Sequence, residues 1–280
     1  MTHVLQRMAS SRLWHHGPAL VLAAGLALLL GSGPDDGELT RTIVAVAVLQ
    51  AGLVLTWSAA LGFRGYVGSL LIGAGAAAAA DVAALDVGDQ FGSTGDDRLG
   101  PLAAVLALAL ILAFVHQLTR RSPRVALTES MAGVTLLSAL VVAPSAYLVL
   151  AQLSEGPALL RTCVASLGAA LVVGHLVDLL APVPRIVEGV PRGLLGFVLG
   201  TGAGMYAAVR TEGTDGLVEQ LGSLILGGVL GGLACLLAIG ASYAAVERRG
   251  SSAAKAVVQA AVPFAAAAPV AYFVAVLVAG

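Results

Sequence analysis

The sequence predicts an all-α integral membrane protein, a polytopic bundle of about nine transmembrane helices. Of the 280 residues, 58% are hydrophobic and only 11% are charged, and the mean hydropathy is +0.94. Soluble domains carry about 25% charged residues, so this composition indicates a chain that resides in lipid. Because the alternating pattern of barrel strands is absent, its apolar segments are expected to satisfy their backbone polar groups within helices.

Nine apolar stretches are separated by short polar loops. They cover residues 17–33, 41–61, 66–86, 99–119, 127–152, 158–181, 193–210, 217–246 and 256–279. Most are long enough to cross about 30 Å of hydrocarbon. We therefore expect a short cytoplasmic lead over residues 1–16 and one multispanning domain over residues 17–280. The alternative is that the basic lead and the first apolar run form a cleavable signal peptide.

Arginine positions predict the orientation of the bundle. With the N-terminus in the cytoplasm, most basic residues fall on the inner side, as the positive-inside rule requires. Only four of the 15 then lie outside: Arg41, Arg98, Arg161 and Arg210. Nine spans put the C-terminus on the external side. Lys255 is the only lysine, and Ala and Gly dominate, which is typical of GC-rich coding and indicates an actinobacterial chain in the bacterial cytoplasmic membrane.

Glycines at every fourth position predict close packing of two spans. In the stretch 193–210 they are Gly196, Gly200 and Gly204, and in the stretch 217–246 they are Gly227 with Gly231 and Gly228 with Gly232. A stripe without side chains lets two helix backbones approach closely. We expect these two spans to touch.

The stretch 171–193 carries the strongest functional signal. His175 and Asp178 lie three residues apart in an apolar span that breaks at Pro182 and Pro184, and this spacing places them on one helical face. An ionisable side chain inside a span costs about 2.5 to 3.5 kcal/mol to insert, so the pair is a candidate functional site. It can relay protons or contribute to a metal site; the other interpretation is a satisfied polar pair packed inside the bundle.

No motif predicts catalysis or a bound metal. The chain has no Gly-x-Ser-x-Gly, His-Glu-x-x-His or Cys-x-x-Cys sequence, and two ligands do not make a metal site. Cys163 and Cys235 lie in apolar spans without a pairing pattern and are expected to be small apolar fillers. A net charge of -1 argues against nucleic acid. The expected partners are membrane lipids, and possible further ones are a membrane protein or a second copy of this chain.

A ring of arginines at the cytoplasmic face suits a phosphate ligand. Its members are Arg120, Arg121, Arg124, Arg185, Arg192, Arg248 and Arg249. Guanidinium groups bind phosphate through paired hydrogen bonds, so the ring is compatible with a lipid head group or a nucleotide. The alternative is that these arginines only fix the topology.

Several segments along nearly the whole chain resemble the motifs of one family of membrane enzymes. Trp57-Ser-Ala-Ala-Leu-Gly-Phe-Arg64 is similar to the family's aromatic-Glu helix end, and Arg120-Arg-Ser-Pro-Arg-Val-Ala-Leu127 to its basic connector. Asp178 falls at or within one position of the Asp in the family's Ala-Asp-Thr-x-Ala-Tyr segment, and Pro191-Arg192-Gly193 matches part of the following loop. By these motifs the chain resembles the phosphatidate cytidylyltransferase (CDP-diacylglycerol synthase) family, multispanning enzymes that join CTP and phosphatidate at a cytoplasmic, Mg²⁺-dependent site.

The chain departs from the family before its last helix. The family signature there contains Lys-Arg, Lys-Asp, His-Gly-Gly and Asp-Arg-x-Asp, whose carboxylates hold the metal ions; here Ala245-Val-Glu-Arg-Arg249 matches only the basic pair. Phosphoryl transfer depends on such metals. We therefore expect a non-catalytic relative without a cofactor, with a lipid-binding, regulatory or scaffolding role.

Two alternatives remain, and the resemblance implies one geometry. The first alternative is a small permease or transporter component that uses His175 and Asp178. The second is an active cytidylyltransferase whose rebuilt site holds Mg²⁺ through Asp178, Glu188 and Glu247. In the family, the loops before the seventh and ninth helices line the nucleotide and lipid site. The resemblance therefore implies that the basic residues of these loops converge on one anionic head group: Arg185, Arg192, Arg248 and Arg249.

Overall fold

The computed structural model describes residues 2–32, 39–62, 65–85, 98–119, 126–181, 183–186, 189–212, 217–248 and 250–279. These residues form ten helices and one isolated bridge, between Arg185 and Gly193. The helices are α1 (Thr2–Gly31), α2 (Leu39–Leu61), α3 (Tyr66–Leu85), α4 (Gly100–Thr119), α5 (Leu127–Val142), α6 (Ser145–Ala151), α7 (Gly156–Leu180), α8 (Leu194–Glu212), α9 (Leu217–Glu247) and α10 (Ser252–Ala279).

The prediction of a helical protein with several membrane-spanning segments is confirmed. Among the described residues, eight segments are long and apolar enough to cross a membrane: parts or all of α1, α2, α3, α4, α5 with α6, α7, α9 and α10. Large apolar side chains such as Leu28, Leu71 and Ile111 are more than half exposed, as expected for a surface that faces lipid. The remaining predicted span forms α8, in which four glycines take the place of larger apolar side chains.

Two elements differ in detail from the predicted spans. The lead predicted over residues 1–16 and the first span form one continuous helix, α1. The predicted span 127–152 consists of two helices, because Pro144 has no N–H to donate and interrupts the hydrogen-bond ladder. After the interruption the N–H groups of Ala146 and Tyr147 donate to the carbonyls of Ala143 and Pro144, at 3.0 and 2.9 Å.

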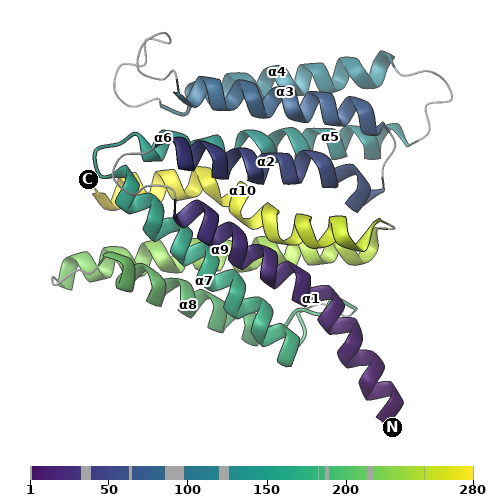
Figure 1. The fold of residues 1–280 in the computed structure, drawn as a ribbon, viewed down its shortest axis with the longest axis vertical. Coiled ribbons are helices and arrows are strands. Elements are labelled where there is room, and N and C mark those ends of the chain that lie inside the picture. The colour runs from purple at the N-terminus through teal and green to yellow at the C-terminus, as the bar shows by residue number, and fades with distance from the viewer. Residues whose placement is uncertain are drawn as a thin grey trace.

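The helices run side by side in a bundle with α10 in its middle (Figure 1). On one side of α10 lie α2, α3, α4, α5 and α6, and on the other side lie α1, α7, α8 and α9. The N-terminal end of α1, the turn from α7 to α8 and the turn from α9 to α10 lie at one end of the bundle, and the C-terminus lies at the opposite end (Figure 1).

The predicted glycine contact is confirmed. A Cβ added to Gly204 of α8 would lie 3.0 Å from Gly231 Cα and 3.1 Å from the Gly227 carbonyl oxygen of α9. One added to Gly200 would lie 2.8 Å from the Ala170 carbonyl oxygen of α7. The glycine stripe thus seats α8 against both neighbouring helices, as close packing of small residues allows.

Candidate functional site

A buried polar network lies where α7 ends and the chain turns back into α8. The last turns of α7 place His175 and Asp178 on one inward face, where they are 0% and 1% exposed. The returning loop is closed by backbone hydrogen bonds, including Leu194 N–H to the Pro184 carbonyl at 2.8 Å and Ile186 N–H to the Arg192 carbonyl at 3.1 Å. This closure positions Arg192 beside the face formed by His175 and Asp178.

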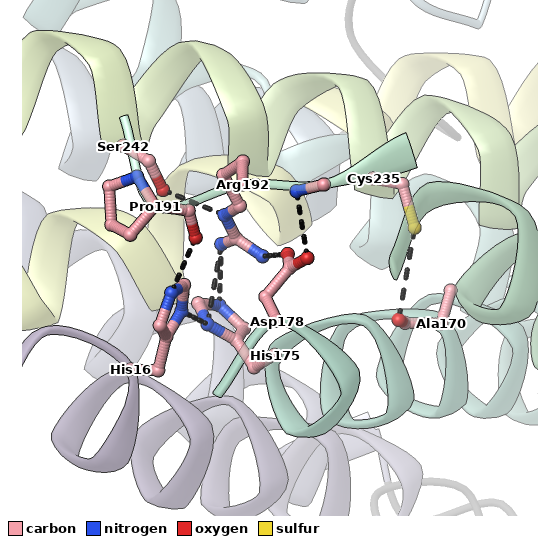
Figure 2. Close-up of polar contacts among 9 residues, drawn as sticks. His16, Ala170, His175, Asp178, Pro191, Arg192, Cys235 and Ser242 are labelled. Carbon is pink, nitrogen blue, oxygen red and sulfur yellow. Dashed lines mark hydrogen bonds and ion pairs between the residues drawn. The ribbon is translucent and has the colours of Figure 1, made fainter. Parts of the chain in front are cut away.

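Arg192 points into the protein and contacts side chains of α7 and α9 (Figure 2). Its Nη1 donates to Asp178 Oδ2 at 3.1 Å, and its Nε donates to Ser242 Oγ of α9 at 2.9 Å. Its Nη2 lies 3.0 Å from Nε2 of His175. The N–H of Gly193 donates to the other carboxylate oxygen, Asp178 Oδ1, at 2.9 Å. Both oxygens of Asp178 are therefore engaged by protein donors.

His16 of α1 completes the network, and its contacts favour one assignment of the imidazole protons. Its Nε2 lies 2.7 Å from the Pro191 carbonyl and its Nδ1 lies 3.1 Å from Nδ1 of His175. A carbonyl only accepts, so Nε2 of His16 carries the proton, and Nδ1 of a neutral ring accepts. Nδ1 of His175 must then donate, which leaves Nε2 of His175 as the acceptor for Arg192. Two neutral imidazoles with these tautomers give one donor and one acceptor to each of the three shorter contacts, whereas the longer approach of Arg192 Nη2 to Nδ1 of His175, at 3.3 Å, then faces two donors.

We call this group the Arg192 network. It consists of the side chains of His16, His175, Asp178, Arg192 and Ser242 with the backbone groups of Pro191 and Gly193. Burial lowers the pKa of the Arg192 guanidinium, and the adjacent Asp178 carboxylate raises it. Because guanidinium retains its proton in proteins, the network contains one cation and one anion. The charges balance inside the bundle.

The turn at the start of α8 depends on a glycine. A side chain at Gly196 would collide with the Asp178 carboxylate. One turn further along the helix, Gly200 faces Cys235 Sγ of α9. Cys163 and Cys235 are both free and buried, and Cys235 Sγ lies 3.8 Å from the Ala170 carbonyl. Small residues therefore allow α8 to begin directly beside the network.

The other predicted site residues occupy different environments. Arg185 is exposed, with its backbone bridged to Gly193. Arg248 is also exposed and forms an ion pair with Glu129 at 3.4 Å. Arg192, in contrast, is only 3% exposed, and its guanidinium group is enclosed by protein groups.

The alternative metal site requires Asp178, Glu188 and Glu247 to lie together, and the described residues do not show such a group. Glu247 is exposed at the end of α9, while both oxygens of Asp178 are bound to Arg192 and Gly193. Glu188, like Arg249, lies outside the described residues. Within the part of the chain that the structure describes, no three His, Cys, Asp or Glu side chains are arranged to hold a metal ion.

Sequence reasoning missed a second polar group, on the other side of α10. Gln50 of α2, Asp81 of α3 and Ser145 of α6 meet beside the carbonyl of Val141 in α5. We call these three side chains and this carbonyl the Asp81 cluster. The available signal was a lone carboxylate directly after five alanines in an apolar span. His16 and Ser242 of the Arg192 network lie far from His175 and Arg192 in the sequence, so no motif linked them to these partners.

Comparisons with protein-family models, curated proteins and solved structures find no match to this chain. The geometry of the two polar groups and of the basic end of the bundle therefore carries the functional interpretation.

Proposed function

We propose that this chain is a non-catalytic multipass protein of the bacterial cytoplasmic membrane that binds an anionic phospholipid head group at the basic end of its bundle. The observation that carries the proposal is the inward position of Arg192. Its buried contacts with Asp178 and Ser242 hold the loop between α7 and α8 against α9. The loop therefore presents Arg185 from a fixed backbone.

Arg185 and Arg248 are exposed arginines at this end of the bundle, and Arg248 would exchange its ion pair with Glu129 for the lipid phosphate. Arg185 is bridged to Gly193, the residue after Arg192. Arg248 follows Ser242 by six residues at the end of α9, which places it about 9 Å further along the helix axis, toward the same end of the bundle. Guanidinium groups bind phosphate with directional hydrogen bonds. Each also contributes about 1 kcal/mol of attraction to an anionic leaflet, whatever the lipid.

The engagement of Asp178 supports a role without metal-dependent catalysis. A metal ion at this carboxylate would have to displace Arg192 and the Gly193 N–H, and would leave the guanidinium buried without its anion. The same contacts argue against the permease alternative, because a proton relay through His175 and Asp178 requires groups that are free to exchange partners. The network is better suited to holding helices together.

The proposal includes a topology of nine membrane crossings with the N-terminus in the cytoplasm. Eight described segments have the length and composition of a span, and the glycines of α8 pack it against both α7 and α9. Counting α8 as the ninth crossing agrees with chain ends on opposite sides of the bundle (Figure 1). The cytoplasmic assignment of the basic end rests on the arginine distribution.

Native mass spectrometry of the detergent-extracted protein tests the head-group site. We expect the wild type to retain phosphatidate or another anionic phospholipid, and Arg185→Ala with Arg248→Ala to lose it. The matched control replaces two arginines at the other predicted face, Arg98→Ala with Arg210→Ala, and should retain the lipid. Equal retention by both double variants, or no retention by the wild type, would show that the basic end does not form a head-group site.

A further inference from the structure

We propose that the Asp81 cluster binds a small monovalent metal cation of the sodium class, independently of the phospholipid site. Three oxygens converge there on the amide nitrogen of Gln50. Its Nε2 lies 2.8 Å from Asp81 Oδ1, 3.0 Å from the Val141 carbonyl and 3.3 Å from Ser145 Oγ. Ser145 Oγ itself donates to Asp81 Oδ1 at 2.7 Å.

The single negative charge of Asp81 indicates that the ligand is a monovalent cation. Asp81 lies within the candidate span formed by α3, and its contacts are with the neutral side chains of Gln50 and Ser145. Asp178, by comparison, has Arg192 as a counter-charge. An ionised carboxylate inside a span is costly unless it is paired. One bound monovalent cation would balance one carboxylate, whereas a divalent ion would leave an excess positive charge in the bundle.

The interruption between α5 and α6 supplies a backbone ligand. Because Pro144 has no N–H, the donors that follow turn to Ala143 and Pro144 instead of continuing the helical ladder. The Val141 carbonyl accepts from the side chain of Gln50. Carboxylate, carbonyl and hydroxyl oxygens are the ligands that hard cations prefer. Carbonyls released at interrupted helices are also typical of coupling-ion sites in membrane proteins.

Gln50 completes the coordination set by rotating its amide. In the present arrangement its NH₂ group occupies the point where the three oxygens converge and donates to Asp81 and Val141. A half-turn of the terminal amide exchanges Nε2 for Oε1, a nearly isosteric change. A cation occupies the convergence point when the Gln50 amide has withdrawn from it, and the rotated amide then presents Oε1 as the fourth oxygen ligand. The contact of Gln152 Nε2 with the Ala84 carbonyl at 2.9 Å keeps α6 against α3, so the site retains its width.

Thermal unfolding of the full-length protein in detergent tests the proposal. Sodium chloride is exchanged for choline chloride at constant ionic strength, so that only the metal cation changes. A ligand that binds the folded state raises Tm as its concentration rises. We expect Tm to increase with sodium in the wild type and to be independent of sodium in Asp81→Asn. Removing one ligand with Ser145→Ala should raise the sodium concentration required by about tenfold.

A control and a direct measurement separate this site from other effects. Glu155→Gln removes an exposed carboxylate at the end of the bundle to which α6 leads and should keep the sodium response. Equilibrium dialysis with radioactive sodium should find one ion per wild-type chain and none in Asp81→Asn. Stability that follows pH but not sodium, or equal sodium responses in wild type and Asp81→Asn, would overturn the proposal. Phospholipid retention, measured on the same samples, reports separately on the head-group site.

Discussion

The Arg192 network and the Asp81 cluster are built around the same chemical group, an aspartate within an apolar helix, but Asp178 is buried and Asp81 only partly so, and the two differ in what surrounds them. Asp178 receives a guanidinium at 3.1 Å and a backbone N–H at 2.9 Å. Asp81 receives an amide at 2.8 Å and a hydroxyl at 2.7 Å, both neutral. The first carboxylate is balanced by the protein itself, whereas the second requires a cation or a proton from outside. The groups that contact an aspartate therefore decide, more than the aspartate itself, whether it holds helices together or is available to a ligand.

The helices around each aspartate agree with this difference. The Arg192 network ties together α1, α7, α8 and α9, and α8 packs against α7 and α9 so closely that a Cβ added to Gly200 or Gly204 would collide with backbone atoms. The Asp81 cluster lies at the interruption between α5 and α6, where the backbone ladder is incomplete. A regular helix satisfies its own carbonyls, and an interrupted one offers them to a ligand.

The largest effect is expected from removing the cation of the Arg192 network. Arg192→Ala leaves Asp178 buried without a counter-charge, and loss of one member of a buried ion pair costs about 3 to 5 kcal/mol. Denaturant unfolding in detergent should show a free energy of unfolding lowered by this amount. The double variant Arg192→Met with Asp178→Leu removes both charges and should recover much of the loss. A single variant as stable as the wild type would show that the pair does not fasten the helices.

An intermediate effect is expected at the start of α8, where the chain offers a matched pair of glycines. A Cβ at position 196 would collide with the Asp178 carboxylate, whereas one at Gly202 would meet nothing within 4 Å. Gly196→Ala should therefore destabilise the protein by about 1 to 3 kcal/mol through overpacking. Gly202→Ala should be neutral or stabilising by up to about 1 kcal/mol, because alanine favours helix. Equal thermal midpoints for the two variants would contradict the close packing of Gly196 against the Asp178 carboxylate.

The sequence predicted the helices well because apolar length and arginine position are local signals. His175 and Asp178 were identifiable for the same reason, since an ionisable pair stands out in an apolar span. The inward turn of Arg192 was not predictable, because it depends on a loop that closes between Pro184 and Leu194 and on Ser242, 50 residues away. His16 contacts a partner 159 residues away. No spacing rule connects such positions without a known fold.

The Asp81 cluster shows which signals were available and not combined. Pro144 inside the predicted span 127–152 indicates an interruption. Gln50 and Asp81 each stand as isolated polar residues in apolar helices. That Gln50 and Asp81 meet Ser145 follows from how α2, α3 and α6 pack, which composition does not specify. Distances between residues on different helices are therefore what the structure adds to the sequence.

The smallest effect is expected from neutralising Asp81 itself. Asp81→Asn keeps an oxygen to accept from Gln50 and Ser145 and removes a charge whose contacts are with neutral side chains. In choline chloride, where no small metal cation is available, the free energy of unfolding should change by less than about 1 kcal/mol or rise. The corresponding change in the network, Asp178→Asn, leaves Arg192 buried without an anion and should cost several times more. Unfolding of both variants under identical conditions measures the contrast directly. If Asp81→Asn were as destabilising as Asp178→Asn, both aspartates would fasten helices, and the distinction between the two polar groups would fail.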